Sequence, residues 1–314
     1  MTDTPGLPDG PFTTQDATRL GITRHTLRRM VREGVVRRVT ASVYVTAARE
    51  DTVELRARAL ALVLAPHQVV CDRTAAWLYG IDLFTSGDLD VLPEIETCAR
   101  RGHGPCRRKE VDGHSRDLDN SDVTTIEGVQ VTTPLRTALD LACILERRDA
   151  LAALDAFRRR EGLTVAHLVV GSQRYRRRRG VIQQRELIPL SDPRAESTRE
   201  SWTRLAIHDE GLPAPEPQVW VEVGGVPTYR LDLAYRRRRI AIEYDGWEAH
   251  ESTPEQQKKT RARRKWLRDH GWTVIVVRNG DFTGPELERW LGELREALAS
   301  PYSNRRRLER GSRR

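Results

Sequence analysis

The stretch Thr228–His250, TYRLDLAYRRRRIAIEYDGWEAH, decides the fold of the C-terminal part of this chain. Two short apolar runs, Tyr229–Ala234 and Ile240–Tyr244, have the length and composition of β-strands, and the four arginines Arg236–Arg239 separate them. A polar break of this length predicts a hairpin. Because side chains alternate along a strand, the pattern places three carboxylates on one side of neighbouring strands. These are the carboxylates of Asp232, Glu243 and Asp245.

The three acids together favour a bound cation, because carboxylates crowded on one surface repel one another. A hard divalent ion with oxygen ligands, Mg²⁺ or Mn²⁺, suits such a set. Each acid also has a structural alternative: Asp232 as a solvent-facing residue, and Glu243 as the partner of a nearby arginine such as Arg263. We favour the metal site because all three acids fall in one pattern.

The sequence around this hairpin predicts helices and strands in a definite order. Residues Arg194–Glu210 have a helical pattern, which would place Glu196 and Glu200 on one helix face. The other expected elements are a strand at Gln218–Glu222, a helix from about Glu255 to His270, a strand at Trp272–Val277 and a helix at Pro285–Ala299.

This order resembles the core of PD-(D/E)XK nucleases, in the variant found in the Vsr-like (very-short-patch-repair-like) endonucleases of bacteria. The similarity covers roughly Asp192–Leu298. The matching motifs are AESTRES, RLDLAY, IAIEYDG with His250 after it, and a basic helix that leads into GWTVIVVR.

The resemblance implies a role for each matching residue. Mg²⁺ or Mn²⁺ would be bound and would activate water for hydrolysis of DNA phosphodiesters. Thr260 stands where these relatives often carry an aspartate, which leaves open a domain that binds DNA without cutting it. The implied catalytic residues are Asp232, Glu243, Asp245, His250 and Glu200, and the implied metal ligands are Asp232, Glu243, Asp245 and Glu196.

Composition indicates a polyanion as a partner. The chain has 314 residues, 53 of them lysine or arginine, and a formal net charge of +8. A protein with this positive net charge most often binds nucleic acid. The alternative is an arginine-rich proteome, which would raise the number of arginines in all of its proteins. In the C-terminal part, the predicted DNA contacts are Arg236, Arg237 and Arg263.

Because the sequence lacks the corresponding motifs, we do not expect a zinc-finger protein, a secreted protein or a membrane-spanning protein. The four cysteines form no CxxC pair, so free thiols in a reducing cytosol are expected. The N-terminus has no cationic start and no apolar segment, and the longest apolar stretch is too short to cross a bilayer. We therefore expect a cytoplasmic protein with no membrane partner and no small-molecule cofactor.

The N-terminal stretch Phe12–Thr46 has the pattern of a winged helix-turn-helix. A short helix ends at Gly21, a second helix runs from Arg24 to Glu33, and two β-branched runs follow as a hairpin. The second helix carries donors suited to phosphates and guanine edges. We favour DNA binding over a protein-interaction winged helix because the helix is so basic. The predicted contacts are Arg24, His25, Arg28, Arg29 and Arg32.

The N-terminal half resembles the AbiEi-type antitoxins, the transcriptional partners in type IV toxin–antitoxin systems. The winged helix and the middle motifs DRTAAWLYGI and VTTPLRTALDLA carry this resemblance. It implies repression of transcription and a cognate toxin as a partner. The middle part shows no catalytic pattern, and we interpret Asp140, in an apolar helix, as a structural group.

We therefore predict an α/β multidomain chain with two alternative functions. The first is a DNA-binding, Mg²⁺-dependent endonuclease. The second is a non-catalytic transcriptional regulator or antitoxin with a decayed nuclease fold. RNA binding has no support beyond charge. The expected parts are a winged helix at 1–50, an α+β domain at 51–172, an arginine-rich hinge at 173–190, a PD-(D/E)XK domain at 191–299 and a basic tail at 300–314.

Overall fold

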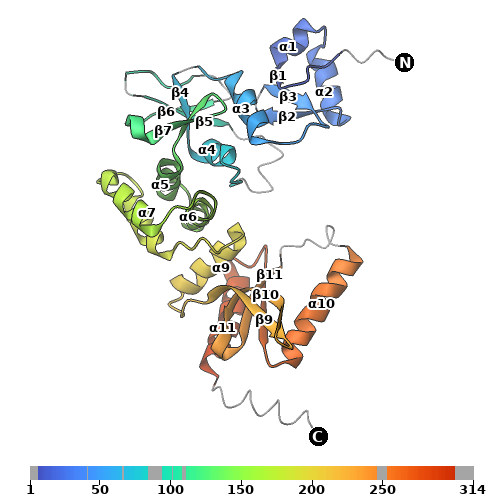
Figure 1. The fold of residues 1–314 in the computed structure, drawn as a ribbon, viewed down its shortest axis with the longest axis vertical. Helices are drawn as coiled ribbons and strands as arrows, with labels where there is room; N and C mark the ends of the chain where they lie inside the picture. Colours follow the sequence, from blue (N-terminus) through green and yellow to red (C-terminus); the bar gives the residue numbers. More distant parts are fainter. Residues whose placement is uncertain are drawn as a thin grey trace. The chain divides into compact units, whose positions relative to one another are not determined.

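The computed structural model describes residues 6–40, 42–65, 67–83, 94–100, 102–107, 111–245 and 253–300. The described residues have a mixed α/β fold with three separate sheets (Figure 1). It forms two compact units: residues 1–144 with 163–184, and residues 145–162 with 185–314.

The first unit begins with two helices and a small sheet with the strand order β1-β3-β2. Thr13 caps α1 and Thr23 caps α2, because each side chain accepts a backbone N–H three residues later. The apolar faces of both helices pack against the sheet around Phe12 and Val36. The elements are β1 (Phe12–Thr13), α1 (Thr14–Arg19), α2 (Arg24–Arg32), β2 (Val36–Thr40) and β3 (Val43–Thr46).

The rest of the first unit is built on a five-stranded mixed sheet with the order β6-β5-β4-β8-β7. Its core contains Leu60, Val70, Leu78 and Val131, all fully or almost fully buried. The elements are α3 (Val53–Ala61), β4 (Gln68–Val70), α4 (Asp72–Leu78), β5 (Ile95–Ala99), β6 (Val111–Ser115), η2 (Asn120–Asp122), β7 (Val123–Ile126), β8 (Val129–Thr132), α5 (Pro134–Ile144), α7 (Val165–Ser172) and η3 (Gln173–Tyr175).

The second unit is built on a four-stranded sheet with the order β12-β11-β10-β9. Strands β9, β10 and β11 are antiparallel neighbours, and β11 and β12 are parallel. Helices α9 and α11 cover one face around Trp290, and α10 covers the other through Leu267. The elements are α9 (Thr198–Asp209), β9 (Glu216–Val223), β10 (Val226–Tyr235), η5 (Arg236–Arg238), β11 (Ile240–Asp245), α10 (Pro254–Asp269), β12 (Thr273–Arg278) and α11 (Gly284–Ala299).

The division between the units differs from the expected domain borders. Helix α6 (Arg147–Glu161), which we expected in the middle domain, belongs to the second unit. Its buried Asp155 accepts hydrogen bonds from Ser201 and Arg204 of α9. The expected hinge at 173–190 contains η3, α8 (Val181–Leu187) and η4 (Ile188–Leu190), and its Gln184 side chain is fully buried.

Other differences concern element ends. Helix α9 begins at Thr198 and not at Arg194, because Ser197 accepts the backbone N–H of Glu200 and so caps the helix there. Sequence analysis did not predict α7 or the strands β4 to β7. It did predict a strand at Leu89–Leu92, which lies outside the described residues. Within the described residues, no helix is long and apolar enough to cross a membrane.

Candidate nucleic-acid interface

Helix α2 is strongly amphipathic. Leu27 and Met30 are buried against the small sheet. Helical spacing places the basic side chains on the opposite side, since residues three and four apart share a face. All five are exposed: Arg24, His25, Arg28, Arg29 and Arg32.

This exposed face of α2 carries few compensating acids. Arg29 lies 3.7 Å from Glu33, and both side chains are more than half exposed. Within the described part of the chain, Arg24, Arg28 and Arg32 have no ion pair. A stripe of cations free to turn towards solvent suits phosphate contacts, because no structural bond has to be broken when phosphate binds.

The β2–β3 hairpin extends the basic character beside α2. The exposed Arg38 lies over the Tyr44 ring, 6.0 Å from its centroid, and Arg37 donates to the Arg49 carbonyl. Ser42, in the turn, has a φ of +66°. This left-handed conformation is uncommon for residues other than glycine and closes the hairpin tightly.

Three of the four acids predicted to bind a metal lie in the second unit on β10 and β11, namely Asp232, Glu243 and Asp245. The Asp232 carboxylate accepts the backbone N–H of Tyr244 at 3.0 Å. Burial raises the pKa of Asp232 to about 6; the Tyr244 hydrogen bond opposes this shift, and the charges of Glu200 and Glu243 add to it. The structure therefore brings Asp232, Glu200 and Glu243 near one another.

Two arginines of α10 neutralise the acids of β11. Glu243 is 1% exposed, and its two oxygens lie 2.8 Å from Arg263 and 3.4 Å from Arg264. Arg264 also lies 2.9 Å from Asp245. The contact between Arg263 and Glu243 has ion-pair distance but not hydrogen-bond alignment. The structural alternative for Glu243, pairing with Arg263, is the arrangement observed.

We had expected the two glutamates of the AESTRES motif to share a helix face. In the structure they do not. Glu196 precedes α9 and lies 2.6 Å from Arg230 of β10. Glu200, in the first turn of α9, accepts the Glu196 N–H and the Gln218 side-chain amide. Helix α9 begins at Thr198, four residues later than expected, which leaves Glu196 outside the helix and explains the error.

The described residues, as placed, do not fit a divalent cation. They contain no group of three or more histidine, cysteine, aspartate or glutamate side chains arranged to hold one. Arginine nitrogens occupy the positions beside Glu243 and Asp245 that a cation would need. His250, the predicted water-activating residue, lies outside the described residues.

The arginines predicted to contact DNA in the second unit have different surroundings. Arg236 and Arg237 lie in the exposed turn η5, and Arg236 is 3.6 Å from Glu216. Arg263 points inward to Glu243 and donates to the Arg230 carbonyl. Arg236 and Arg237 are therefore accessible to a polyanion, whereas Arg263 neutralises Glu243 within the protein.

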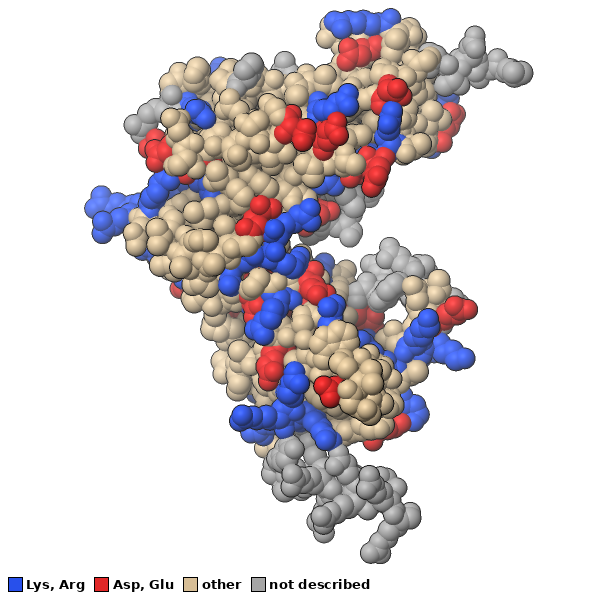
Figure 2. Space-filling model, viewed as in Figure 1, with Lys and Arg blue, Asp and Glu red and all other residues tan. Residues whose placement is uncertain are grey.

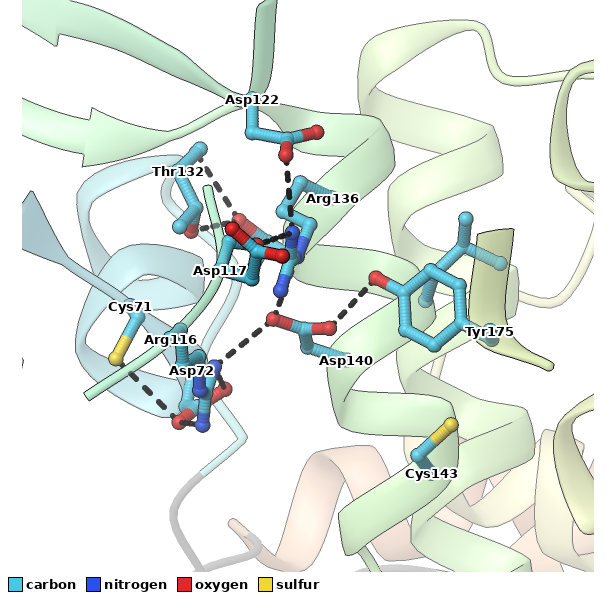
Figure 3. Close-up of polar contacts among 12 residues, drawn as sticks. Cys71, Asp72, Arg116, Asp117, Asp122, Thr132, Arg136, Asp140, Cys143 and Tyr175 are labelled. Carbon is cyan, nitrogen blue, oxygen red and sulfur yellow. Dashed lines mark hydrogen bonds and ion pairs between the residues drawn. The ribbon is translucent and has the colours of Figure 1, made fainter. Parts of the chain in front are cut away.

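Sequence analysis missed most of a buried charge network in the first unit (Figure 3). Its centre is Asp140, which is fully buried on α5 and confirmed as a structural group. Arg116 lies 2.9 Å from Asp140 and also holds Asp72 at the start of α4. The other groups that bind Asp140 are Arg136, Tyr175 and Arg178.

The network fixes the charge states of its members. Burial alone would lower the pKa of Arg116, but the hydrogen bond and charge of Asp72 outweigh it and raise that pKa. Burial, together with Asp140, raises the pKa of Tyr175, which therefore stays a donor to Asp140.

Glu96 lies beside this network. Burial and the charge of Asp72 raise the pKa of Glu96 to about 7, although the backbone N–H groups of α4 oppose the shift. The spacing of Arg136 and Asp140, four apart in an apolar helix, was the sequence signal for part of this network.

Comparison with known proteins assigns these features to families. Residues 9–47 match the family described as "Transcriptional regulator, AbiEi antitoxin". Residues 68–190 match the family described as "AbiEi antitoxin C-terminal domain". Helix α2 lies in the first match, and the charge network lies in the second.

Two relatives come from Mycobacterium tuberculosis. They are the uncharacterized protein MT2308 of strain CDC 1551 / Oshkosh and the uncharacterized protein Rv2248 of strain ATCC 25618 / H37Rv. Each is 33% identical to this chain over 256 residues, which are 82% of this chain and 90% of the relative. The chain belongs to the family of these mycobacterial proteins. It carries both AbiEi antitoxin domains, which confirms the resemblance of its N-terminal half, and neither domain match extends past residue 190.

We expect Mg²⁺ and Mn²⁺ to leave the melting temperature of this AbiEi-domain protein unchanged. A cation could bind Glu243 only by displacing two guanidinium groups, and a ligand stabilises a fold only if it binds. Thermal unfolding with and without metal, on the wild type and Asp232→Ala, measures this. A saturable rise in melting temperature that Asp232→Ala abolishes would instead establish the metal site.

Proposed function

We propose that this chain is a DNA-binding transcriptional regulator of the AbiEi antitoxin type. The observation that carries the proposal is the exposed, largely unpaired basic face of α2, within the residues that match the AbiEi transcriptional regulator family. Two helices that follow β1 and precede the β2–β3 hairpin, with all three strands in one sheet, support a winged helix-turn-helix. In it, α2 would lie in the major groove and present Arg24, His25, Arg28, Arg29 and Arg32.

The match of residues 68–190 to the AbiEi antitoxin C-terminal domain supports a second partner, a cognate toxin. The buried network around Asp140 joins α4, α5, η3 and the segment after β6. In the proposed arrangement, the domain tied together in this way would support the winged helix and present a protein-binding surface.

The endonuclease function of residues 191–299 stays a prediction. The antiparallel hairpin followed by the parallel pair β11–β12, with helices on both faces, supports a PD-(D/E)XK-like core. The arginine-neutralised acids support the non-catalytic alternative for that core. Incubation of plasmid with the full chain and Mg²⁺ or Mn²⁺, with Asp232→Ala as control, distinguishes the two.

Selection from a library of random DNA duplexes tests the regulator proposal. We expect the wild-type chain to enrich a recurrent sequence, because the donors of α2 read base edges as well as phosphates. Arg24→Gln with Arg28→Gln should abolish the enrichment. Arg160→Gln with Arg185→Gln, which removes the same charge from exposed positions in the second unit, should preserve it. A wild-type chain that enriches no sequence would overturn the proposal.

A further inference from the structure

Helix α10 carries a stripe of cations on its exposed side. The helix has seven basic and two acidic residues among its 16. Leu267 faces the sheet, and Arg263 and Arg264 point to the acids of β11. The remaining basic residues lie outward, and four of them repeat at spacings of three and four, which places them on one face. These four are Lys258, Arg261, Lys265 and Arg268, and all are exposed.

Helix α11 of the same unit shows that this stripe is not a general property of an arginine-rich chain. It also has 16 residues, but it has two basic and four acidic residues. Arg289 pairs with Glu286 and Glu293, and Arg295 lies 2.5 Å from Glu210. The exposed arginines of α11 therefore have carboxylate partners on the protein itself.

The stripe on α10 has little such compensation. Among the described residues, Lys258, Arg261 and Arg268 have no ion pair, and only Lys265 is paired, with Asp269 at 2.6 Å. Like charges three and four residues apart repel one another and destabilise a helix. An external polyanion would relieve this repulsion. Lysine and arginine side chains gather over α10 on the right of the lower unit in Figure 2.

We propose that this face of α10 is a second contact surface for duplex DNA and binds backbone phosphates without reading sequence. The inference rests on the proposed function for the choice of DNA as the polyanion. From Lys258 to Arg268 the stripe rises roughly 15 Å along the helix, at about 1.5 Å per residue. This length equals the axial rise of about four base pairs, at 3.4 Å per phosphate of one strand.

The surroundings of the stripe favour a duplex over single-stranded RNA. Proteins that bind single strands stack the bases on accessible aromatic rings. Trp266, the aromatic residue of α10, is half-buried. Its ring is stacked on the His270 ring, with 3.8 Å between the centroids, and packs on the Tyr229 ring, with 5.0 Å between the centroids. The exposed side of the helix thus offers charge and no stacking surface, which suits a regular phosphate backbone.

The wild-type full chain and three double variants test the proposal by titration of a mixed-sequence DNA duplex, and of a single-stranded RNA, over a range of salt concentrations. Arg261→Gln with Arg268→Gln removes two charges of the stripe and leaves the Lys265–Asp269 pair intact. Arg24→Gln with Arg28→Gln removes two from α2. Arg160→Gln with Arg185→Gln is the matched control, and circular dichroism checks each fold. We expect the α10 variant to lower the salt slope of binding by about two relative to the control, since each lost phosphate contact lowers it by roughly 0.9.

The outcomes separate this inference from the proposed function. An α10 variant that equals the control, with a weakened α2 variant, would overturn the inference and leave the regulator proposal intact. A weakened α10 variant with an unaffected α2 variant would support the inference and contradict α2 as the DNA-binding helix. An α10 variant that loses affinity for single-stranded RNA but not for the duplex would overturn the inference in favour of an RNA partner.

Discussion

Replacement of Arg116 by alanine should destabilise the first unit by about 3–5 kcal/mol, the range measured when one partner of a buried ion pair is removed. Asp72 and Asp140 are 2% and 0% exposed, so neither carboxylate can turn to water when Arg116 is lost. The loss of Arg116 would destabilise the buried charge of Asp72 more than that of Asp140. Asp140 keeps three partners, namely Arg136, Arg178 and Tyr175.

Asp72 adds a backbone reason for this large effect. Its φ is +52°, a left-handed conformation that costs most residues with a side chain about 1 kcal/mol or more. Two guanidinium contacts from Arg116 hold this conformation at the start of α4. Without them, the first turn of α4 and its packing on the sheet should loosen together.

Urea unfolding of the full chain, followed by circular dichroism, measures the effect of Arg116→Ala. The matched surface control is Arg19→Ala, which breaks the exposed pair with Asp16 and should cost less than about 1 kcal/mol. The pair Arg116→Met with Asp72→Asn should recover part of the loss, because it removes both charges. A loss for Arg116→Ala no larger than that of the surface control would show that the network does not stabilise the unit.

Local patterns predicted most of the helices and several strands. Helix α2 was expected from Arg24 to Glu33 and runs from Arg24 to Arg32, because its cap and its apolar spacing are both local. Strand β12 was expected at Trp272–Val277 and runs from Thr273 to Arg278. The order of elements from α9 to α11 was also correct within the described residues.

Long-range contacts account for what the sequence did not reveal. Asp155 binds Ser201, 46 residues later, and so draws α6 into the second unit. Arg116 lies 44 residues from Asp72, and nothing local marks either residue as buried. Charged residues are rarely buried, so a sequence pattern assigns them to the surface by default.

The acids of the second unit show the same limit. The alternation along β10 and β11 predicted that Asp232 and Glu243 face one side, and in the structure the charge of Glu243 helps to raise the pKa of Asp232. It could not show that Arg263 and Arg264, on a helix some twenty residues further on, would reach Glu243. The choice between a cation and an arginine as the partner of an acid depends on tertiary contacts.

Loss of the basic face of α2 should have the second large effect, on DNA affinity. Arg24 and Arg28 are exposed and have no ion pair among the described residues, so their replacement should leave the fold intact. Each contributes one phosphate contact in the proposed arrangement. The double variant Arg24→Gln with Arg28→Gln should therefore lower the salt slope by about two and weaken binding most at low salt.

The most direct test of the DNA-binding account is this salt slope for the full chain on the duplex enriched by selection. Fluorescence anisotropy across a salt series gives the slope for the wild type, the α2 variant and the control Arg160→Gln with Arg185→Gln. The account predicts a slope lower by about two for the α2 variant and an unchanged slope for the control. Equal slopes and equal affinities for all three proteins would contradict it.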